Sequence, residues 1–192
     1  WEYEMPALER PITTVVISLD GAMIPMADSA GYREAMVGTL ACYDPEGERQ
    51  HSIYLAAAPE YGNKEFLQRL EREILRAKQH FPAARYLGIA DGAASNWRFL
   101  EQHTDRQLID FFHGTEYVGK IAQALYPQRQ AAGKRAQWQQ EHCQALKHDP
   151  DARDVLIGEA ARLSRRHALS QKVRDDVLSA WTYFTNHRHQ MD

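Results

Sequence analysis

Three strand-like segments follow one another along this chain before the first helical segment appears. Residues 13–19 are β-branched or apolar almost throughout, which is typical of a strand buried on both faces. Residues 32–43 and 51–58 form the next two strands, and the sequence DPEGE at 44–48 between them is strong turn chemistry. The chain is therefore predicted to open with a three-stranded antiparallel meander.

The hydrophobic period then changes to that of a helix, which Asn63 can cap and which the sequence HFP at 80–82 ends. Residues 85–90 form a fourth strand. We expect this strand to run parallel to the first, because a helical crossover leads into it and such crossovers are right-handed. The apolar positions that define the helical face are Phe66, Leu70, Ile74 and Ala77.

Strand and helix continue to alternate after the fourth strand. Ser95 can cap a second helix, residues 107–112 (QLIDFF) indicate a fifth strand, and Thr115 can cap a third helix. If the fourth strand inserts beside the first, the fold is α/β, with a mixed five-stranded sheet in the order 3-2-1-4-5 and flanking helices. From Gln128 onward the pattern is helical, with segments at 135–146, 152–163 and 171–184.

This pattern divides the chain into an entering segment (1–12), an α/β core (13–127) and a helical extension (128–192). The chain starts at Trp1 rather than Met, so we expect it to be a piece of a longer protein. No apolar run approaches the roughly 20 residues that a membrane helix needs, which argues against a membrane partner. Cys42 and Cys143 show no metal-ligand spacing, which fits a reducing cytoplasmic compartment and argues against a disulfide scaffold.

Charge is unevenly distributed along the chain. Residues 1–127 contain 12 Lys or Arg and 18 Asp or Glu, a net charge of −6. Residues 128–192 contain 11 and 8, a net charge of +3. If the protein meets nucleic acid, the second part is the better candidate for phosphate contacts.

Two Asp-Gly pairs occur where buried strands are expected to end. Asp20 and Gly21 follow the first strand, and Asp91 and Gly92 follow the fourth. If these strands are parallel neighbours, both aspartates lie at the carboxyl edge of the sheet, where ligands of open α/β sheets gather. Two close carboxylates repel each other unless a cation lies between them, and Mg²⁺ prefers such oxygen ligands. Asp-Gly is also a common turn pair, so the alternative is that these pairs are ornamental, meaning turns that bind no ligand.

The sequence DFFHG at 110–114 adds a third element. Asp110 and His113 are expected at the end of the fifth strand, beside the fourth. From there His113 could bind a phosphate, orient a water or hold a carboxylate. On spacing alone, a capping histidine at a strand–helix junction is the favoured interpretation.

Five segments carry a resemblance to a known family: ISLDGAMIPM, YREAMVGTLACYDPEGER, IYLAAAPEYGNKEFLQRL, ADGAASNWRFL and DFFHGTEYV. In this order and spacing they resemble the catalytic domain of bacterial insertion-sequence transposases of the ISKra group, which are similar to eukaryotic Mutator-like transposases. The resemblance covers residues 13–127, and the helical part matches only in type.

The resemblance implies an RNase H-like fold with a DDE active site. Asp20 matches the first acid and Asp91 the second, and DFFH matches an Asp-x-x-His motif at Asp110 and His113. It implies two Mg²⁺ or Mn²⁺ ions, with Asp20 bridging both and Asp91 holding one, and Gly21 and Gly92 supporting the acids. The third acid of the family is a Glu in a segment that we do not find here, so we expect this chain alone to be inactive.

The implied activity is metal-dependent cleavage and strand transfer at insertion-sequence ends in the bacterial nucleoid. The implied partners are double-stranded DNA, as transposon ends and target, and further copies of the chain in a homo-oligomeric active complex. Three alternatives remain open: an RNase H-like nuclease that never joins strands, a catalytically incomplete derivative that binds DNA or protein, and an α/β domain with ornamental Asp-Gly turns.

Overall fold

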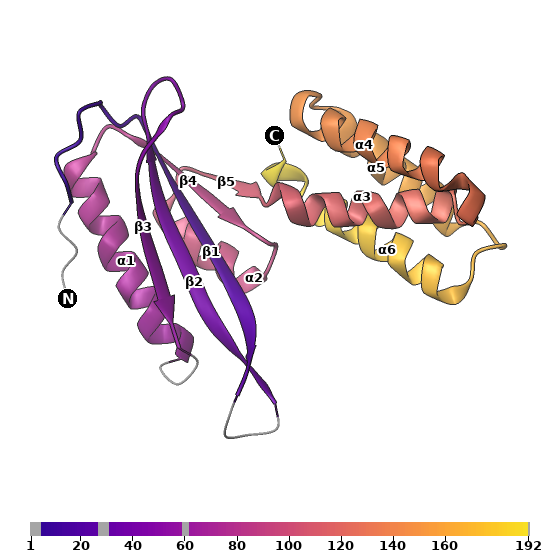
Figure 1. The fold of residues 1–192 in the computed structure, drawn as a ribbon, viewed down its shortest axis with the longest axis horizontal. Coiled ribbons are helices and arrows are strands. Elements are labelled where there is room, and N and C mark those ends of the chain that lie inside the picture. Colours follow the sequence, from indigo (N-terminus) through magenta and orange to yellow (C-terminus); the bar gives the residue numbers. More distant parts are fainter. Residues whose placement is uncertain (1–4, 27–30, 59–61, 192) are drawn as a thin grey trace. The chain divides into compact units, whose positions relative to one another are not determined.

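The computed structural model describes residues 5–26, 31–58 and 62–191, so the first four residues of the entering segment lie outside it. The chain forms two compact units, one up to Leu108 and the other from Ile109 onward (Figure 1). The sequence had placed this boundary after residue 127. It lies earlier because the helix that follows the last strand packs with the later helices. Each unit is described by itself.

The first unit contains a mixed five-stranded sheet in the order β3-β2-β1-β4-β5, as predicted. β1 pairs antiparallel with β2, β2 antiparallel with β3, and β1 parallel with β4. The parallel pair agrees with the crossover argument, because a helix separates β3 from β4 in the chain. The strands are β1 (Thr14–Pro25), β2 (Tyr32–Tyr43), β3 (Arg49–Ala57), β4 (Arg85–Ala90) and β5 (Arg106–Ile109).

β1 is longer than the sequence indicated. It was expected to end at Leu19, but it continues to Pro25, and its pairing with β2 runs to Pro25 opposite Tyr32. The Asp-Gly pair does not turn the chain here, because both residues stay paired with β2, opposite Val37 and Met36. What ends after Leu19 is the ladder with β4. The β1–β2 hairpin therefore extends beyond the rest of the sheet (Figure 1).

Helices α1 (Gly62–His80) and α2 (Ala94–His103) cover the same face of the sheet. A Cβ at Gly38 would lie 3.0 Å from the Phe66 ring, and one at Gly88 would lie 3.1 Å from Leu100. The cross-strand pairing puts Gly38 and Gly88 on one face, so both helices lie there. The residues buried beneath them include Val15, Ile17, Leu19, Leu40, Tyr86 and Ala90.

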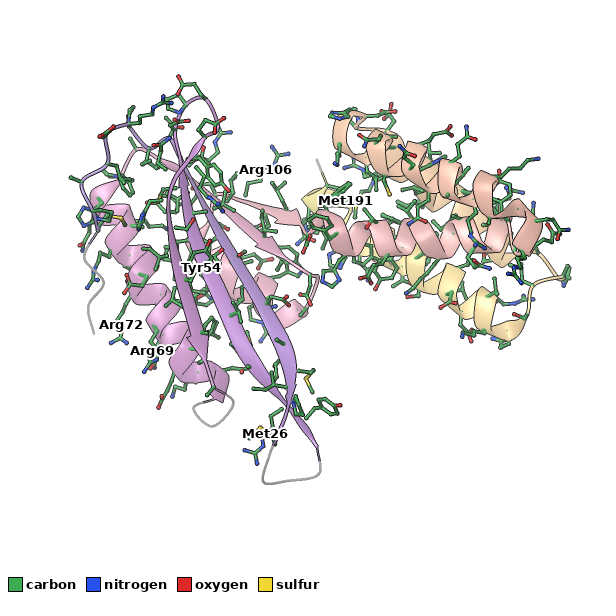
Figure 2. The ribbon with its side chains drawn as sticks, in the orientation of Figure 1. Met26, Tyr54, Arg69, Arg72, Arg106 and Met191 are labelled. Carbon is green, nitrogen blue, oxygen red and sulfur yellow. The ribbon has the colours of Figure 1, made fainter. Side chains whose placement is uncertain are left out.

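The opposite face of the sheet is open within this unit, so the expectation that the first strand is buried on both faces is wrong. Val16 and Ser18 are half-buried, whereas Val15 and Ile17 have no exposed surface. On this open face Val37 is 39% exposed, and Tyr54, which Figure 2 labels, is 70% exposed.

The second unit is helical and has its own core. Amphipathic faces of three helices meet in it, with Ile121, Leu156 and Phe184 fully buried. Tyr117 stacks on Tyr183 with ring centroids 3.9 Å apart. The three later helices contain the predicted segments. The helices are α3 (Phe111–Leu125), α4 (Ala132–His148), α5 (Ala152–Ser164) and α6 (Gln171–Asn186), with short 3₁₀ turns η2 (Arg129–Ala131) and η3 (Arg188–Gln190).

The predicted helix caps were mostly misplaced. Asn63 lies inside the first turn of α1, and α2 begins after Ala93 rather than at Ser95. α3 begins after Asp110 rather than at Thr115, and β5 ends at Ile109, so DFFHG opens a helix. At the start of α3 the Asp110 side chain accepts from the N–H of Phe112, whereas Ala93 at the start of α2 provides no side-chain cap.

A buried carboxylate closes the β2–β3 turn that DPEGE predicted. The Asp44 side chain is fully buried and accepts four hydrogen bonds. Burial opposes its ionisation, but bonds from the Arg10 guanidinium and from the N–H groups of Glu48 and Glu46 outweigh it and hold the pKa of Asp44 below its usual value. The four bonds come from Arg10 Nη1 (2.9 Å), Gln50 Nε2 (2.8 Å), Glu48 N (2.8 Å) and Glu46 N (3.1 Å).

Asp44→Asn is expected to destabilise the sheet unit at neutral pH and to destabilise it least in acid. A carboxyl whose pKa is lowered by folding contributes stability above its unfolded pKa and loses that contribution as pH falls through the folded value. Urea unfolding of both proteins at several pH values measures the difference. A gap between them that widens as pH falls would contradict this role of Asp44.

Candidate functional site

Asp20 lies in β1, one residue beyond the last β1–β4 pair. That pair is Leu19 with Ala90, and the next residues on the two strands are Asp20 and Asp91. Leu19 is buried under the helices, so strand alternation directs Asp20 toward the open face, where it is exposed. Its Oδ1 accepts a hydrogen bond from the N–H of Gly21 at 2.7 Å. The second carboxylate oxygen has no hydrogen bond within the described residues.

Asp91 is half-buried in the turn between β4 and α2. Its Oδ1 accepts from the N–H of Ala93 at 3.1 Å and from Nδ2 of Asn96 at 3.4 Å. Ala93 is the N-cap of α2 and provides no side-chain cap, so the Asp91 carboxylate acts in its place at the positive end of the helix. Asp91 thus has a local structural role that the sequence interpretation did not include.

The structure brings the two aspartates to neighbouring positions, as the sequence predicted. Adjacent strands lie about 4.8 Å apart, and Asp20 and Asp91 each follow a residue of the same ladder pair. Whether the two carboxylates act together in catalysis stays a prediction.

Glycine follows each of the two acids for a different structural reason. Gly92 has φ of +113°, a conformation that L side chains rarely adopt, so the turn that places Asp91 needs glycine. Gly21 is ordinary extended backbone, but a Cβ there would overlap the carboxylate of Glu34. Glycine at position 21 therefore leaves room for the Glu34 side chain and is not required by a turn.

Asp110 and His113 belong to the helical unit. Asp110 is the N-cap of α3, and its Oδ1 accepts from the N–H of Phe112 at 2.8 Å. His113 is half-buried in the first turn of the same helix. Asp110 directly follows the last residue of β5, Ile109, as expected, and it starts α3. The expected position is wrong for His113, because the strand ends at Ile109 and His113 lies in the helix. A direct role for His113 in catalysis stays a prediction.

Sequence reasoning missed two residues beside the acids. Asn96 is only 8% exposed and donates to Asp91. The sequence feature that could have indicated this contact is an amide side chain one helical turn after the Asp-Gly pair. Glu34 lies over Gly21, and Asn63 donates to its Oε2 at 3.4 Å. The pairing of Glu34 with Met23 puts it on the helix-covered side of the hairpin, opposite to Asp20. No sequence spacing could have indicated this cross-strand contact.

The donor set suits a hard divalent cation only in part. Asp20 and Asp91 each supply a carboxylate, the ligand type that Mg²⁺ and Mn²⁺ prefer. Over residues 5–26, 31–58 and 62–191, no group of three His, Cys, Asp or Glu side chains could hold a metal ion. The two aspartates therefore fit as two ligands of a site that needs further oxygen donors from solvent or substrate.

Among the described residues, Cys42, Cys143 and His103 do not form a competing site. Burial raises the pKa of the Cys42 thiol, and it also raises that of Cys143, which Lys147 partly offsets. A thiol with a raised pKa is a poor nucleophile. Burial lowers the pKa of His103, whose Nε2 lies 3.8 Å from Glu71 Oε1 between α2 and α1.

Gly92→Ala is expected to destabilise the sheet unit by about 1–2 kcal/mol, because alanine is strained at positive φ. Gly158→Ala is the matched control. Gly158 lies inside α5 with open space around its Cα, so alanine should stabilise that helix by about 0.5–1 kcal/mol. Urea unfolding followed by circular dichroism measures both. Equal effects of the two substitutions would contradict the need for glycine at position 92.

Two comparisons with known proteins bear on this site. Neither the family models nor the curated proteins compared with the chain give a match. In the described part of the chain, no helix combines the length and apolar character needed to cross a membrane. A functional assignment therefore depends on the fold and on the geometry of the acids.

Proposed function

We propose that this chain is the catalytic domain of a DNA transposase of the DDE type, with an RNase H-like fold. The observation that carries the proposal is the position of Asp20 and Asp91 directly after the Leu19–Ala90 pair of the parallel β1–β4 ladder. The strand order β3-β2-β1-β4-β5 is the order that the transposase resemblance implies. The acids at this edge are those that match the family's first and second catalytic positions.

Asp20 and Asp91 would hold Mg²⁺ or Mn²⁺, of which the resemblance implies two ions. When bound, such ions supply Lewis acidity for phosphoryl transfer, at the attacking oxygen and at the leaving oxygen. Asp20, on an extended strand, presents a carboxylate oxygen with no hydrogen bond in the described residues. Asp91 is oriented by the N–H of Ala93 and by Asn96, which fixes one of its oxygens and leaves the other for a ligand.

The substrate in this proposal is double-stranded DNA carrying the ends of an insertion sequence. Cleavage and strand transfer are two uses of one site, with water or a DNA 3′-hydroxyl as the nucleophile. A homo-oligomeric active complex and a cytoplasmic location at the nucleoid belong to the same proposal. His113, at the start of α3, remains a candidate for contact with phosphate or a carboxylate.

A second candidate is a binding module that uses this fold without catalysis. It is favoured by the local bonds of the acids, since Asp20 accepts from Gly21 and Asp91 serves the start of α2. Both carboxylates would then have local roles only, Asp20 within the extended strand β1 and Asp91 at the start of α2. The metal titration below separates this candidate from the enzyme.

Asp20→Asn with Asp91→Asn is expected to weaken Mn²⁺ binding by the chain. The wild type should bind Mn²⁺ at concentrations up to about 1 mM, the weak end of carboxylate sites, with selective broadening of the amide signals of Gly21, Gly92 and Ala93. The double variant should lose at least about tenfold in affinity, because both charged ligands are gone. Calorimetry and amide NMR measure the two effects.

Asp149→Asn with Asp151→Asn is the control for this titration, since it removes two exposed carboxylates from the α4–α5 connection. It should bind Mn²⁺ as the wild type does. Equal binding by the wild type and the Asp20/Asp91 variant would support the binding module. In a protein that cleaves end-containing DNA, strand-transfer products would distinguish a transposase from a nuclease, which gives hydrolysis alone.

A further inference from the structure

One end of the helical unit concentrates positive charge. The connections from α3 to α4 and from α5 to α6 lie at this same end (Figure 1). Residues 126–135 and 162–174, which form these connections and the adjoining helix ends, contain no Asp or Glu. We name their cations the basic end: Arg129, Lys134, Arg135, Arg162, Arg165, Arg166, Lys172 and Arg174.

Most of these cations are exposed and available to a ligand. Arg165, Arg166 and Lys172 are exposed, and their side chains form no ion pair within the described residues. Arg162 pairs with Glu159 one helical turn away, and Arg135 donates to Gln123 Oε1 at 2.6 Å. The protein itself therefore neutralises little of this charge.

Helix dipoles explain only part of the basic end. Arg165 and Arg166 follow the last turn of α5, where cations stabilise the helix. Lys172 lies in the first turn of α6 and Arg174 one residue beyond it, with no acid in that turn to offset them. Cations at a helix N-terminus oppose its dipole, so this arrangement is unfavourable for the helix alone. An anion bound at this helix start would be stabilised by the same charges and by the N–H groups of the first turn.

The connection between α5 and α6 is held in a defined conformation. The N–H of Arg166 donates to the carbonyl of Leu163 at 2.9 Å, and Arg174 Nη2 donates to the carbonyl of Arg166 at 3.4 Å. Ser170 caps α6 by accepting from the N–H of Val173 at 3.5 Å. The backbone that carries Arg165, Arg166 and Lys172 is thus ordered before any ligand arrives, which lowers the entropic cost of binding.

The composition of the basic end favours a duplex phosphate backbone as its ligand. Six of its eight cations are arginines, whose planar guanidinium groups bind phosphate in a bidentate way. Single-stranded nucleic acid is bound by exposed aromatic platforms, but the one aromatic side chain of these two segments other than His167 is Tyr126, which is half-buried. Membrane binding needs an exposed apolar helix face, and Leu169 is half-buried.

We propose that the basic end of the helical unit binds the phosphate backbone of double-stranded DNA without reading its sequence. The choice of DNA among polyanions rests on the proposed function. The contact surface itself rests on the charge, exposure and helix polarity of this unit. Its residues belong to the helical unit, whereas Asp20 and Asp91 belong to the sheet unit.

The test measures binding of the chain to a labelled 30-base-pair duplex over a range of salt concentrations. The variant is Arg165→Ala with Arg166→Ala and Lys172→Ala, which leaves the backbone bonds of the connection in place. Each phosphate contact contributes about 0.9 to the slope of log affinity against log salt, so the slope should become shallower by roughly 2–3 units. Affinity at about 100 mM salt should fall by at least roughly tenfold.

The control removes the same charge elsewhere. Lys64, Arg69 and Arg72 are exposed on α1, where Figure 2 labels the two arginines, and their triple alanine variant also loses three positive charges. It should keep the wild-type slope. Thermal unfolding followed by circular dichroism verifies that both variants are folded, and Arg165→Ala alone, which should lower the slope by about 1 unit, provides a milder version of the test.

The proposal would be overturned by no duplex binding by the wild type, by an unchanged salt slope in the basic-end variant, or by an equal loss in the α1 control. Stronger binding to anionic lipid vesicles, to single-stranded DNA or to duplex RNA than to duplex DNA would also overturn it. The Asp20→Asn/Asp91→Asn protein should bind the duplex as the wild type does without Mn²⁺. If the chain binds the duplex but not Mn²⁺, only the catalytic proposal is rejected. If the chain binds Mn²⁺ but not the duplex, only the proposal for the basic end is rejected.

Discussion

The central strand β1 is the constraint on which the sheet unit depends. It pairs with β2 on one side in antiparallel fashion and with β4 on the other in parallel fashion. The parallel pair fixes which residues follow it, so Asp20 and Asp91 meet at one edge as a consequence of register. A shift of one residue would turn Val15, Ile17 and Leu19 out of the core, so burial of these side chains holds the register that positions the acids.

The sequence was sufficient for the order and pairing of the strands, because period and connection length determine both. Residues 32–43 and 85–90 were predicted with their observed bounds. The end of β1 was missed because Asp-Gly usually makes a turn, and here the partner strand β2 continues past it and keeps both residues in the ladder. A local sequence pattern does not indicate how far the pairing with a partner strand continues.

The candidate site could be located from sequence but not described in detail. The neighbouring positions of Asp20 and Asp91 follow from topology. The bond from Asn96 to Asp91 and the approach of Glu34 to Gly21 depend on side chains meeting across elements. The unit boundary was misplaced for a similar reason. The apolar positions of α3, such as Val118 and Ile121, show that it has a buried face, but not that this face packs with α5 and α6.

The two proposed sites have opposite electrostatic requirements. A cation site needs carboxylates that nearby lysines and arginines do not neutralise, whereas a phosphate surface needs cations that nearby acids do not neutralise. At physiological salt, charges interact strongly only within about 8 Å, so each site depends on the sign of the charges immediately around it. Asp20 and Asp91 lie directly beyond the end of the β1–β4 ladder and pair with no cation in the described residues. In our proposal, the basic end meets the second need with two segments free of acids, on helices that the sheet's register does not constrain.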